Sequence, residues 1–203
     1  MPQLPKQDQQ LIQIVDAALA ETTRKSGKWL VCKKGCTPCC HGIFAINQLD
    51  AARLASGLSE LLRSDPDRAA AVKERAIDAW ESLSAKFPGD KTSGILTKKS
   101  GEFDAFADTV GDIPCPVLDP DTGACDLYAH RPMTCRVFGP PVRSGEDGGI
   151  GVCELCYNGV TDKEIAACEM IPDPDNLEEK LNVEVESNIG LQGNTVIAFC
   201  LRG

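Results

Sequence analysis

The chain has 203 residues, 42% of them hydrophobic and 5% aromatic, which suits a single globular domain over residues 1–203. Its formal net charge of −9 argues against nonspecific binding to nucleic acid or to an anionic membrane surface. No apolar run approaches the ~20 residues needed to span a bilayer, and the N-terminal stretch is too polar for a secretory signal, so we expect a cytoplasmic protein without a membrane contact.

Three helices are expected before the middle of the chain. Apolar residues recur at helical spacing over about 7–23, over a second stretch that runs to Leu62, and over about 67–87. Asn47 is the predicted N-cap of the second helix. Trp80 shares the apolar face of the third helix, so we expect it in the core rather than against a ligand.

The rest of the chain is less regular. We expect a connecting loop over 88–106, with a short helical turn near its end, and little regular structure between 115 and 156. The "TDKE" capping box at 161–164 predicts a helix through Cys168, and a further short helix is expected within 173–188. The sequence "NTVIAFC" at 194–200 is interpreted as a terminal strand. The predicted fold class is mainly α, a small helical domain with an irregular cysteine-rich metal-binding layer.

Cysteine is the most informative residue type. There are eleven cysteines, an odd number, and in a reducing compartment dense cysteines are more often metal ligands or redox groups than disulfides. Two C-x2-C spacings, Cys36/Cys39 and Cys153/Cys156, allow two sulfurs of one turn to face one ion. Thiolates select zinc, copper(I) or iron–sulfur clusters. Cys168 lies on an apolar stretch and is expected in the core, as is a second isolated cysteine, Cys200.

Cys39 and Cys40 are adjacent in the chain. Adjacent side chains point about 100° apart on a helix and to opposite sides on a strand, so chelation of one ion by both sulfurs is strained. The pair therefore favours a multinuclear site or two neighbouring sites. The alternative is that one of the two is a small buried hydrophobe.

Four segments together resemble a known family. "CKKGCTPCC", "CPVLD", "CDLYAHRPMTCRVF" and a later cysteine are similar to the YkgJ-type cysteine cluster proteins, which are described as zinc- or iron-chelating domains. The resemblance covers about 32–156 and leaves an N-terminal helix and a C-terminal extension as flanks. Its most specific part is Tyr128–Arg136, while the first gap, three residues instead of two, departs from the family pattern. The resemblance implies metal ligands at Cys32, Cys36, Cys39, Cys40, Cys115, Cys125, Cys135, and Cys153 or Cys156.

Two arginines, Arg131 and Arg136, flank Cys135 in the motif. Two zinc–tetrathiolate centres would add a charge of about −4 to an acidic chain, so cationic side chains near the sulfurs would offset that charge. We therefore predict that both arginines support the bound cofactor. The alternative for Arg131 is an ion pair with a surface carboxylate.

The remaining polar residues of the cysteine-rich segments have simpler interpretations. His41 could replace a cysteine ligand or lie at the surface, and His130 is expected to be structural or exposed. Asp119, Asp121 and Asp126 are interpreted as turn formers around the ligand loop. No phosphate loop, Ser–His–Asp set or pair of catalytic carboxylates is present, so no catalytic residue is predicted.

Three functions remain open. The first is a metal-binding cysteine cluster protein that holds an iron–sulfur cluster or zinc, with a redox or metal-handling role. The second, implied by related clusters in flagellin lysine methylases, is an iron–sulfur-dependent group-transfer enzyme. The third is an interaction module stapled by zinc. The expected partner in all three is a metal ion.

Overall fold

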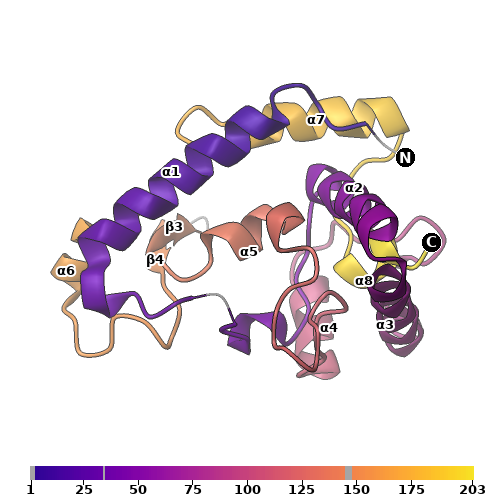
Figure 1. Cartoon of the computed structure of the whole chain (residues 1–203), viewed down its shortest axis with the longest axis horizontal. Helices are drawn as coiled ribbons and strands as arrows, with labels where there is room; N and C mark the ends of the chain where they lie inside the picture. Colours follow the sequence, from indigo (N-terminus) through magenta and orange to yellow (C-terminus); the bar gives the residue numbers. More distant parts are fainter. Residues whose placement is uncertain (1–2, 34, 145–147) are drawn as a thin grey trace. The chain divides into compact units, whose positions relative to one another are not determined.

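The computed structural model describes residues 3–33, 35–144 and 148–203 (Figure 1). Helices predominate over these ranges and the strands are short, which confirms the mainly α class. The α-helices are α1 (Asp8–Ser26), α2 (Gln48–Ser64), α3 (Pro66–Ser84), α4 (Glu102–Val110), α5 (Met133–Val137), α6 (Asp162–Ala167), α7 (Leu177–Ile189) and α8 (Ile197–Leu201). The 3₁₀ turns are η1 (Gly27–Trp29), η2 (Pro38–Cys40) and η3 (Tyr128–His130). The strands form two antiparallel hairpins, β1 (Gly89–Asp90) with β2 (Ile95–Leu96), and β3 (Val142–Ser144) with β4 (Gly149–Gly151).

The chain forms two compact units, which are described separately. The first consists mainly of Gly35–Pro132 and Asn182–Gly203, and the second of Pro5–Lys34 and Met133–Leu181. A single domain over the whole chain stays a prediction.

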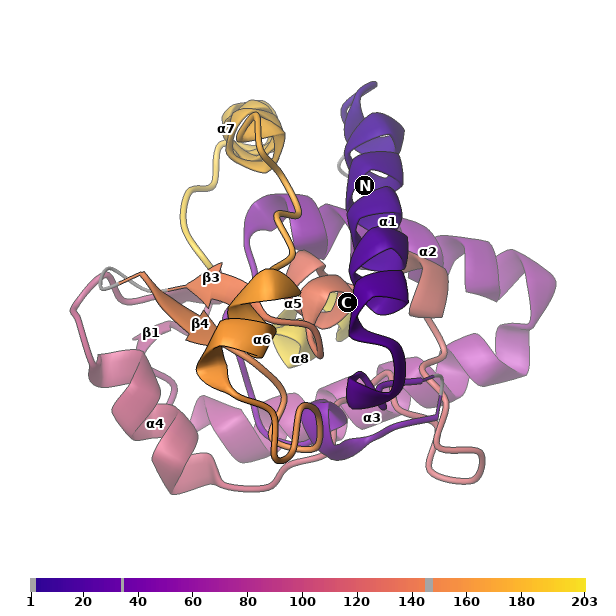
Figure 2. The same ribbon diagram turned by 90° about the vertical axis from the view of Figure 1, so that its left-hand side faces the viewer.

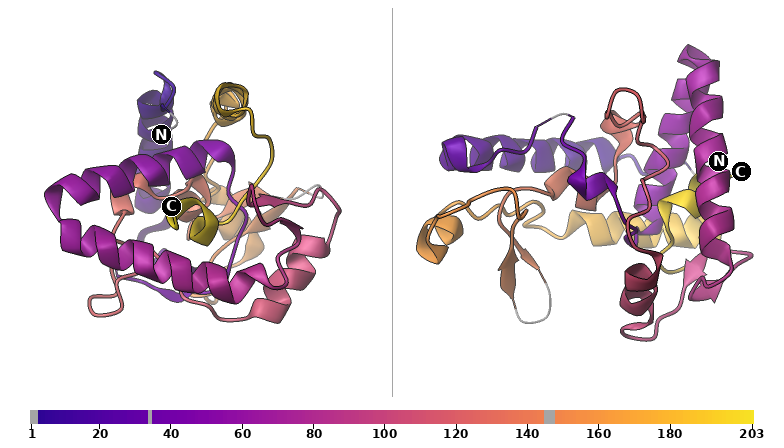
Figure 3. Two further views of the ribbon diagram at one scale, coloured as in Figure 1. Left: turned by 90° about the vertical axis from the view of Figure 1, so that its right-hand side faces the viewer. Right: turned by 90° about the horizontal axis from the view of Figure 1, so that it is seen from below.

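Helices α2 and α3 form the frame of the first unit. Asn47 caps α2, as predicted, by accepting a hydrogen bond from the Asp50 amide at 2.8 Å. Asp65 ends α2 and caps α3, so the two helices turn back on each other without a loop. The left panel of Figure 3 shows them side by side, with α8 against both. The core between these elements includes Ile46, Leu54, Leu58, Val72, Ala76, Val117, Leu127, Ile197 and Leu201.

The predicted terminal strand over 194–200 is wrong. Thr195 does pair in extended form with Ile46, with backbone hydrogen bonds of 2.8 and 2.9 Å, but the chain then turns into helix α8. A short apolar run fits a buried strand and a buried helix equally well by its pattern. The helical form is favoured here because Ile197 and Leu201, four residues apart, both become buried against α2 and α3.

Trp80 lies in the core, as predicted. Its ring centroid is 5.1 Å from those of both Phe87 and Phe199, in edge-to-face arrangements. The predicted loop over 88–106 contains the β1–β2 hairpin, and the helical turn expected near its end is the longer helix α4, whose Phe106 is buried in the same cluster.

The second unit joins α1 and α5 to the β3–β4 hairpin and α6 (Figure 2). The capping box at the start of α6 is confirmed, with Thr161 and Glu164 bonded reciprocally. The helix ends one residue earlier than predicted, at Ala167, and Cys168 is its buried C-cap. A small core of Cys156, Tyr157 and Cys168 packs against Trp29 and Leu30, which follow α1, and against Ile165 of α6.

Helix α7 was also predicted. The Asp173 carboxylate accepts hydrogen bonds from the amides of Leu177 and Glu178, at 3.0 and 2.8 Å, and so caps its first turn. Farther along the helix, Asn182 accepts a hydrogen bond from the Leu49 amide at 3.2 Å, which anchors this part of α7 to α2 within the first unit.

Candidate metal centre

The nine predicted metal ligands divide between the two units. The first unit contains Cys36, Cys39, Cys40, Cys115 and Cys125, and the second contains Cys32, Cys135, Cys153 and Cys156. All eleven cysteines are described, and all are thiols rather than disulfides.

The turn η2 carries the vicinal pair. Pro38 opens the turn, and the Cys40 amide donates to the Thr37 carbonyl at 2.7 Å. The thiols of Cys39 and Cys40 are hydrogen-bonded to each other, and this contact, together with burial, raises the pKa of Cys39. The divergence expected from their adjacency is therefore not found in this turn. Their assignment to different metals stays a prediction.

A second ligand segment runs beside η2. The Cys115 amide donates to the Cys40 carbonyl at 2.7 Å, and His41 pairs with Pro114 in an isolated antiparallel bridge. Cys115 is buried against the core of the first unit, and burial raises its thiol pKa to about 12. Segments distant in the sequence therefore bring their cysteines together through main-chain pairing.

A tight loop brings a third cysteine, Cys125, back beside the segment that carries Cys115. Leu118 and Cys125 form an antiparallel bridge, and Gly123, in the left-handed region with φ of 64°, provides the reversal between them. The sulfurs of Cys115 and Cys125 each accept a hydrogen bond from the amide two residues later, and burial raises the pKa of Cys125. Amide hydrogen bonds to sulfur favour the thiolate over the thiol.

Electrostatic interactions link the sulfurs of the first unit. Cys115 interacts with Cys39 and with Cys125, and Cys39 with Cys40. Cys40 and Cys125 are half-buried against the hydrophobic core that also contains Cys115. Cys40, Cys115 and Cys125 therefore pack on one core, and Cys39 is linked to Cys40 and Cys115 by electrostatic interactions.

Arg131 lies close to these thiols. Its guanidinium carbon is 4.0 Å from the centroid of the Tyr128 ring, so it stacks on an aromatic face. Its charge acts to lower the pKa of both Cys39 and Cys125. This position supports the predicted role of Arg131 beside the cysteines.

Arg136 belongs to the second unit. It is 5% exposed, and its Nη1 donates to Asp16 Oδ1 of α1 at 2.8 Å. This ion pair anchors α5 to α1, and a role of Arg136 beside a cofactor stays a prediction.

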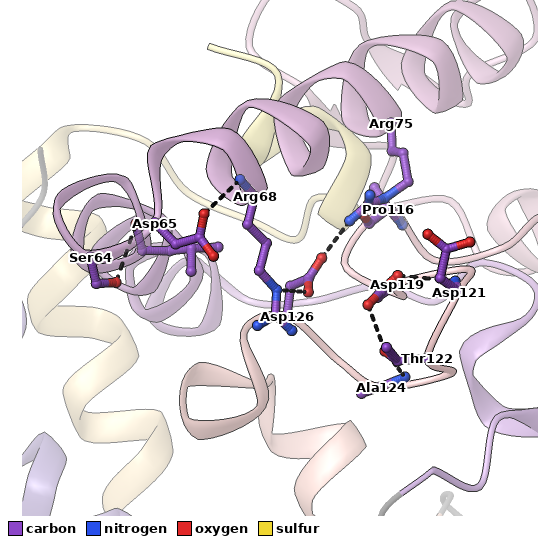
Figure 4. A network of polar contacts seen from close by, with 11 residues as sticks. Ser64, Asp65, Arg68, Arg75, Pro116, Asp119, Asp121, Thr122, Ala124 and Asp126 are labelled. Atoms are coloured by element: carbon purple, nitrogen blue, oxygen red, sulfur yellow. Dashed lines mark hydrogen bonds and ion pairs between the residues drawn. The ribbon is translucent and has the colours of Figure 1, made fainter.

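The three aspartates of the ligand loop differ from one another. Asp119 forms the turn, as predicted, by accepting from the Asp121 amide at 3.0 Å and from the Thr122 hydroxyl at 2.5 Å. Asp126 does not act as a turn former through its side chain, which is 1% exposed and accepts hydrogen bonds from two arginines of α3, Arg68 and Arg75 (Figure 4). The prediction for Asp126 is therefore wrong, because its side chain is held by two arginines of α3 and forms no turn.

The cysteines of the second unit form a smaller group. The Cys156 amide donates to the Cys153 carbonyl at 2.8 Å, and the two side chains share a hydrogen bond. The amides of Val31 and Cys32 donate to the Cys156 sulfur, while burial raises its pKa. Cys32 contacts the Phe138 carbonyl with its sulfur at 3.9 Å, and Cys135 lies on α5.

The two histidines have other partners. His41 Nδ1 lies 3.3 Å from Asp112 Oδ1 at the surface, and His130 Nε2 lies 3.1 Å from Glu60 Oε2. His130 packs so closely on α2 that a Cβ on Gly57 would lie 2.6 Å from its ring. His130 was predicted to be structural or exposed, and its packing on α2 fits the structural alternative.

The arginine pair on α3, Arg68 and Arg75, was not predicted from the sequence. Arg68 and Arg75 are seven residues apart and so share one helix face, which is the signal that could have pointed to a common partner. Cys200 packs against the core, as predicted; its thiol also interacts electrostatically with Cys115, and burial raises its pKa to about 12.

Within the described ranges, no three cysteine, histidine, aspartate or glutamate side chains meet the geometry of a closed metal site. The donor set nevertheless fits zinc or iron, because these metals take cysteine thiolates and the first unit gathers four of them with amide donors and Arg131 nearby. None of the described helices has both the length and the apolar character needed to cross a bilayer.

The fold and the donor set define a helical protein with a cysteine-rich, metal-chelating centre. The family model CxxCxxCC, described as "Putative zinc- or iron-chelating domain", matches residues 31–156. The chain therefore belongs to this family, which confirms the resemblance drawn from its motifs. Neither the curated proteins nor the solved structures yield a match.

Proposed function

We propose that the protein binds zinc or an iron–sulfur cluster through its cysteine thiolates and serves in metal handling or electron transfer in a reducing compartment such as the cytoplasm. The observation that carries the proposal is the gathering of four cysteines: Cys40, Cys115 and Cys125 pack on one buried core, and Cys39 interacts with Cys40 and Cys115. The chain contains eleven cysteines, and a metal bound by thiolates would account for the gathering of several of them at one place.

The residues have distinct tasks in this proposal. The turn η2 supplies two adjacent sulfurs, and the paired segments supply Cys115 and Cys125. Amides of Val117 and Leu127 donate to the latter two sulfurs and stabilise their negative charge. Arg131, stacked on Tyr128, adds a fixed positive charge beside Cys39 and Cys125. When bound, zinc would supply a structural or Lewis-acid centre, and an iron–sulfur cluster an electron carrier.

The second unit provides a separate group of donors. The Cys156 sulfur accepts a hydrogen bond from the Cys32 amide and shares one with Cys153, and Cys135 lies on α5 of the same unit. We propose that these cysteines also bind metal; from this group the family resemblance implies Cys32, Cys135 and one of Cys153 and Cys156 as ligands.

Purification under anaerobic conditions, followed by metal analysis and absorption spectroscopy, tests the proposal. We expect at least one equivalent of zinc or iron per chain, with a brown chromophore if the metal is held as an iron–sulfur cluster. A combined Cys39→Ser, Cys40→Ser, Cys115→Ser variant should lose metal, whereas Cys168→Ala is the matched control because Cys168 is the buried cap of α6. A protein that neither contains nor takes up zinc or iron would contradict the proposal.

A further inference from the structure

A network of hydrogen bonds in the first unit joins helix α3 to both sides of the ligand loop, the segment 115–126 that carries Cys115 and Cys125. The Arg75 guanidinium donates from Nη2 to Asp126 Oδ2 at 2.5 Å and from Nε to the Pro116 carbonyl at 2.8 Å (Figure 4). Pro116 directly follows Cys115, and Asp126 directly follows Cys125. One side chain thus binds the residue after each of two candidate ligands.

The rest of the network makes this connection rigid. The Asp126 side chain is 1% exposed, and its other oxygen accepts from Arg68 Nε. The Asp126 amide donates to the Val117 carbonyl at 2.8 Å, so the two strands of the loop are also paired through the main chain. A planar guanidinium that bonds two partners in fixed directions restricts both more than a single point charge does.

We propose that Arg75 is a positioning residue for metal binding. Its planar guanidinium sets the spacing of Cys115 and Cys125 by holding the residues that follow them, Pro116 and Asp126. This inference rests on the proposed function. Arg75 lies outside the cysteine motifs, on a helix that contributes no candidate ligand. Residues that orient ligands in this way affect metal affinity by about 10–100-fold.

Arg68 offers a matched control, because it lies on the same helix and contacts the same carboxylate, but no bond from it to the Cys115 side of the loop is found among the described contacts. The test compares Arg75→Gln, Arg75→Lys and Arg68→Gln. Each apoprotein is titrated with Zn²⁺ in competition with a chromophoric chelator, and with Co²⁺ to record the thiolate-to-metal charge-transfer band. Far-ultraviolet circular dichroism of each variant establishes that it is folded.

We expect Arg75→Gln to weaken Zn²⁺ binding by at least about tenfold and to reduce the charge-transfer intensity. Arg75→Lys keeps the charge but not the planar guanidinium, so it should not restore binding, and Arg68→Gln should change the affinity by about twofold or less. If Arg75→Gln fails to fold, Arg75→Lys decides the question. Wild-type affinity in Arg75→Lys, or equal losses in Arg68→Gln and Arg75→Gln, would overturn the inference. If the wild type itself binds neither Zn²⁺ nor iron, the proposed function is what has failed.

Discussion

The thiols of Cys39 and Cys40 are hydrogen-bonded to each other across a single 3₁₀ turn. Such a contact holds a proton between two sulfurs, and a metal ion that binds there must displace it. The turn therefore presents two soft donors on one side, although adjacent positions usually direct their side chains apart.

A single substitution at either cysteine of this pair should lower the metal content of the protein. Because the sulfurs lie together, we expect Cys39→Ser and Cys40→Ser each to lose at least one metal equivalent, or the whole chromophore if an iron–sulfur cluster is bound. Metal analysis and absorption spectra of the anaerobically purified variants measure the loss. Full metal content in both variants would mean that the pair is packed as buried thiols and that the site lies elsewhere.

Metal removal should destabilise the fold. The ligand segments contain short bridges and loops rather than long helices, so much of their order depends on cross-links between them. We expect a chelator, under reducing conditions, to lower the melting temperature and to increase amide hydrogen exchange over 115–125 more than over α2 and α3. An unchanged melt of a demonstrably metal-free protein would contradict this coupling.

Much of the fold could be predicted because its causes are local. The cap at Asn47, the capping box at Thr161 and the helical spacing of α1, α2 and α3 are all encoded within a few residues. Helix α8 could not be predicted, because the six-residue apolar run 196–201 takes its form from the surfaces of α2 and α3, against which Ile197 and Leu201 become buried.

The candidate site could be predicted in its residue types but not in its connections. Cysteine spacing and the family motif indicated the ligands, since chemistry restricts which residues bind soft metals. The burial of Asp126 under Arg68 and Arg75 depends on a contact between distant parts of the chain. A charged residue next to a turn has the same sequence pattern whether it lies in solvent or in an ion-pair network.

Neutralising Asp126 should destabilise the first unit. Asp126→Asn replaces a buried carboxylate that accepts from two arginines with an amide that satisfies fewer of their donors. We expect the free energy of unfolding to fall by about 1–3 kcal/mol in urea titrations. The control is Asp121→Asn, an exposed position in the same loop, which should change it by less than about 0.5 kcal/mol. Equal effects of the two substitutions would contradict the structural role of the network.

The metal-free protein should lose stability at alkaline pH. Burial raises the pKa of the Cys200 thiol from near 9 to about 12, so the folded state retains a proton that the unfolded state releases. This contribution is fully present below pH 9 and is lost as the pH rises toward 12. Denaturant titrations of the reduced apoprotein should show that decline, and Cys200→Ala should reduce its slope, the remainder coming from other buried thiols such as Cys115, while lowering stability at all pH values. A slope that Cys200→Ala leaves unchanged would assign the decline to other groups.

Gly57 should resist replacement although it lies within a helix. Alanine normally stabilises a helix interior by about 1 kcal/mol relative to glycine. Here a Cβ would lie 2.6 Å from the ring of His130, which is also bonded to Glu60, so η3 would have to move away from α2. We expect Gly57→Ala to destabilise the protein by about 1–2 kcal/mol in denaturant titrations. In a His130→Ala background the clash is absent, and Gly57→Ala should then stabilise by about 1 kcal/mol. The change of sign between the two backgrounds is the decisive observation, because a glycine retained for flexibility alone would give the same sign in both.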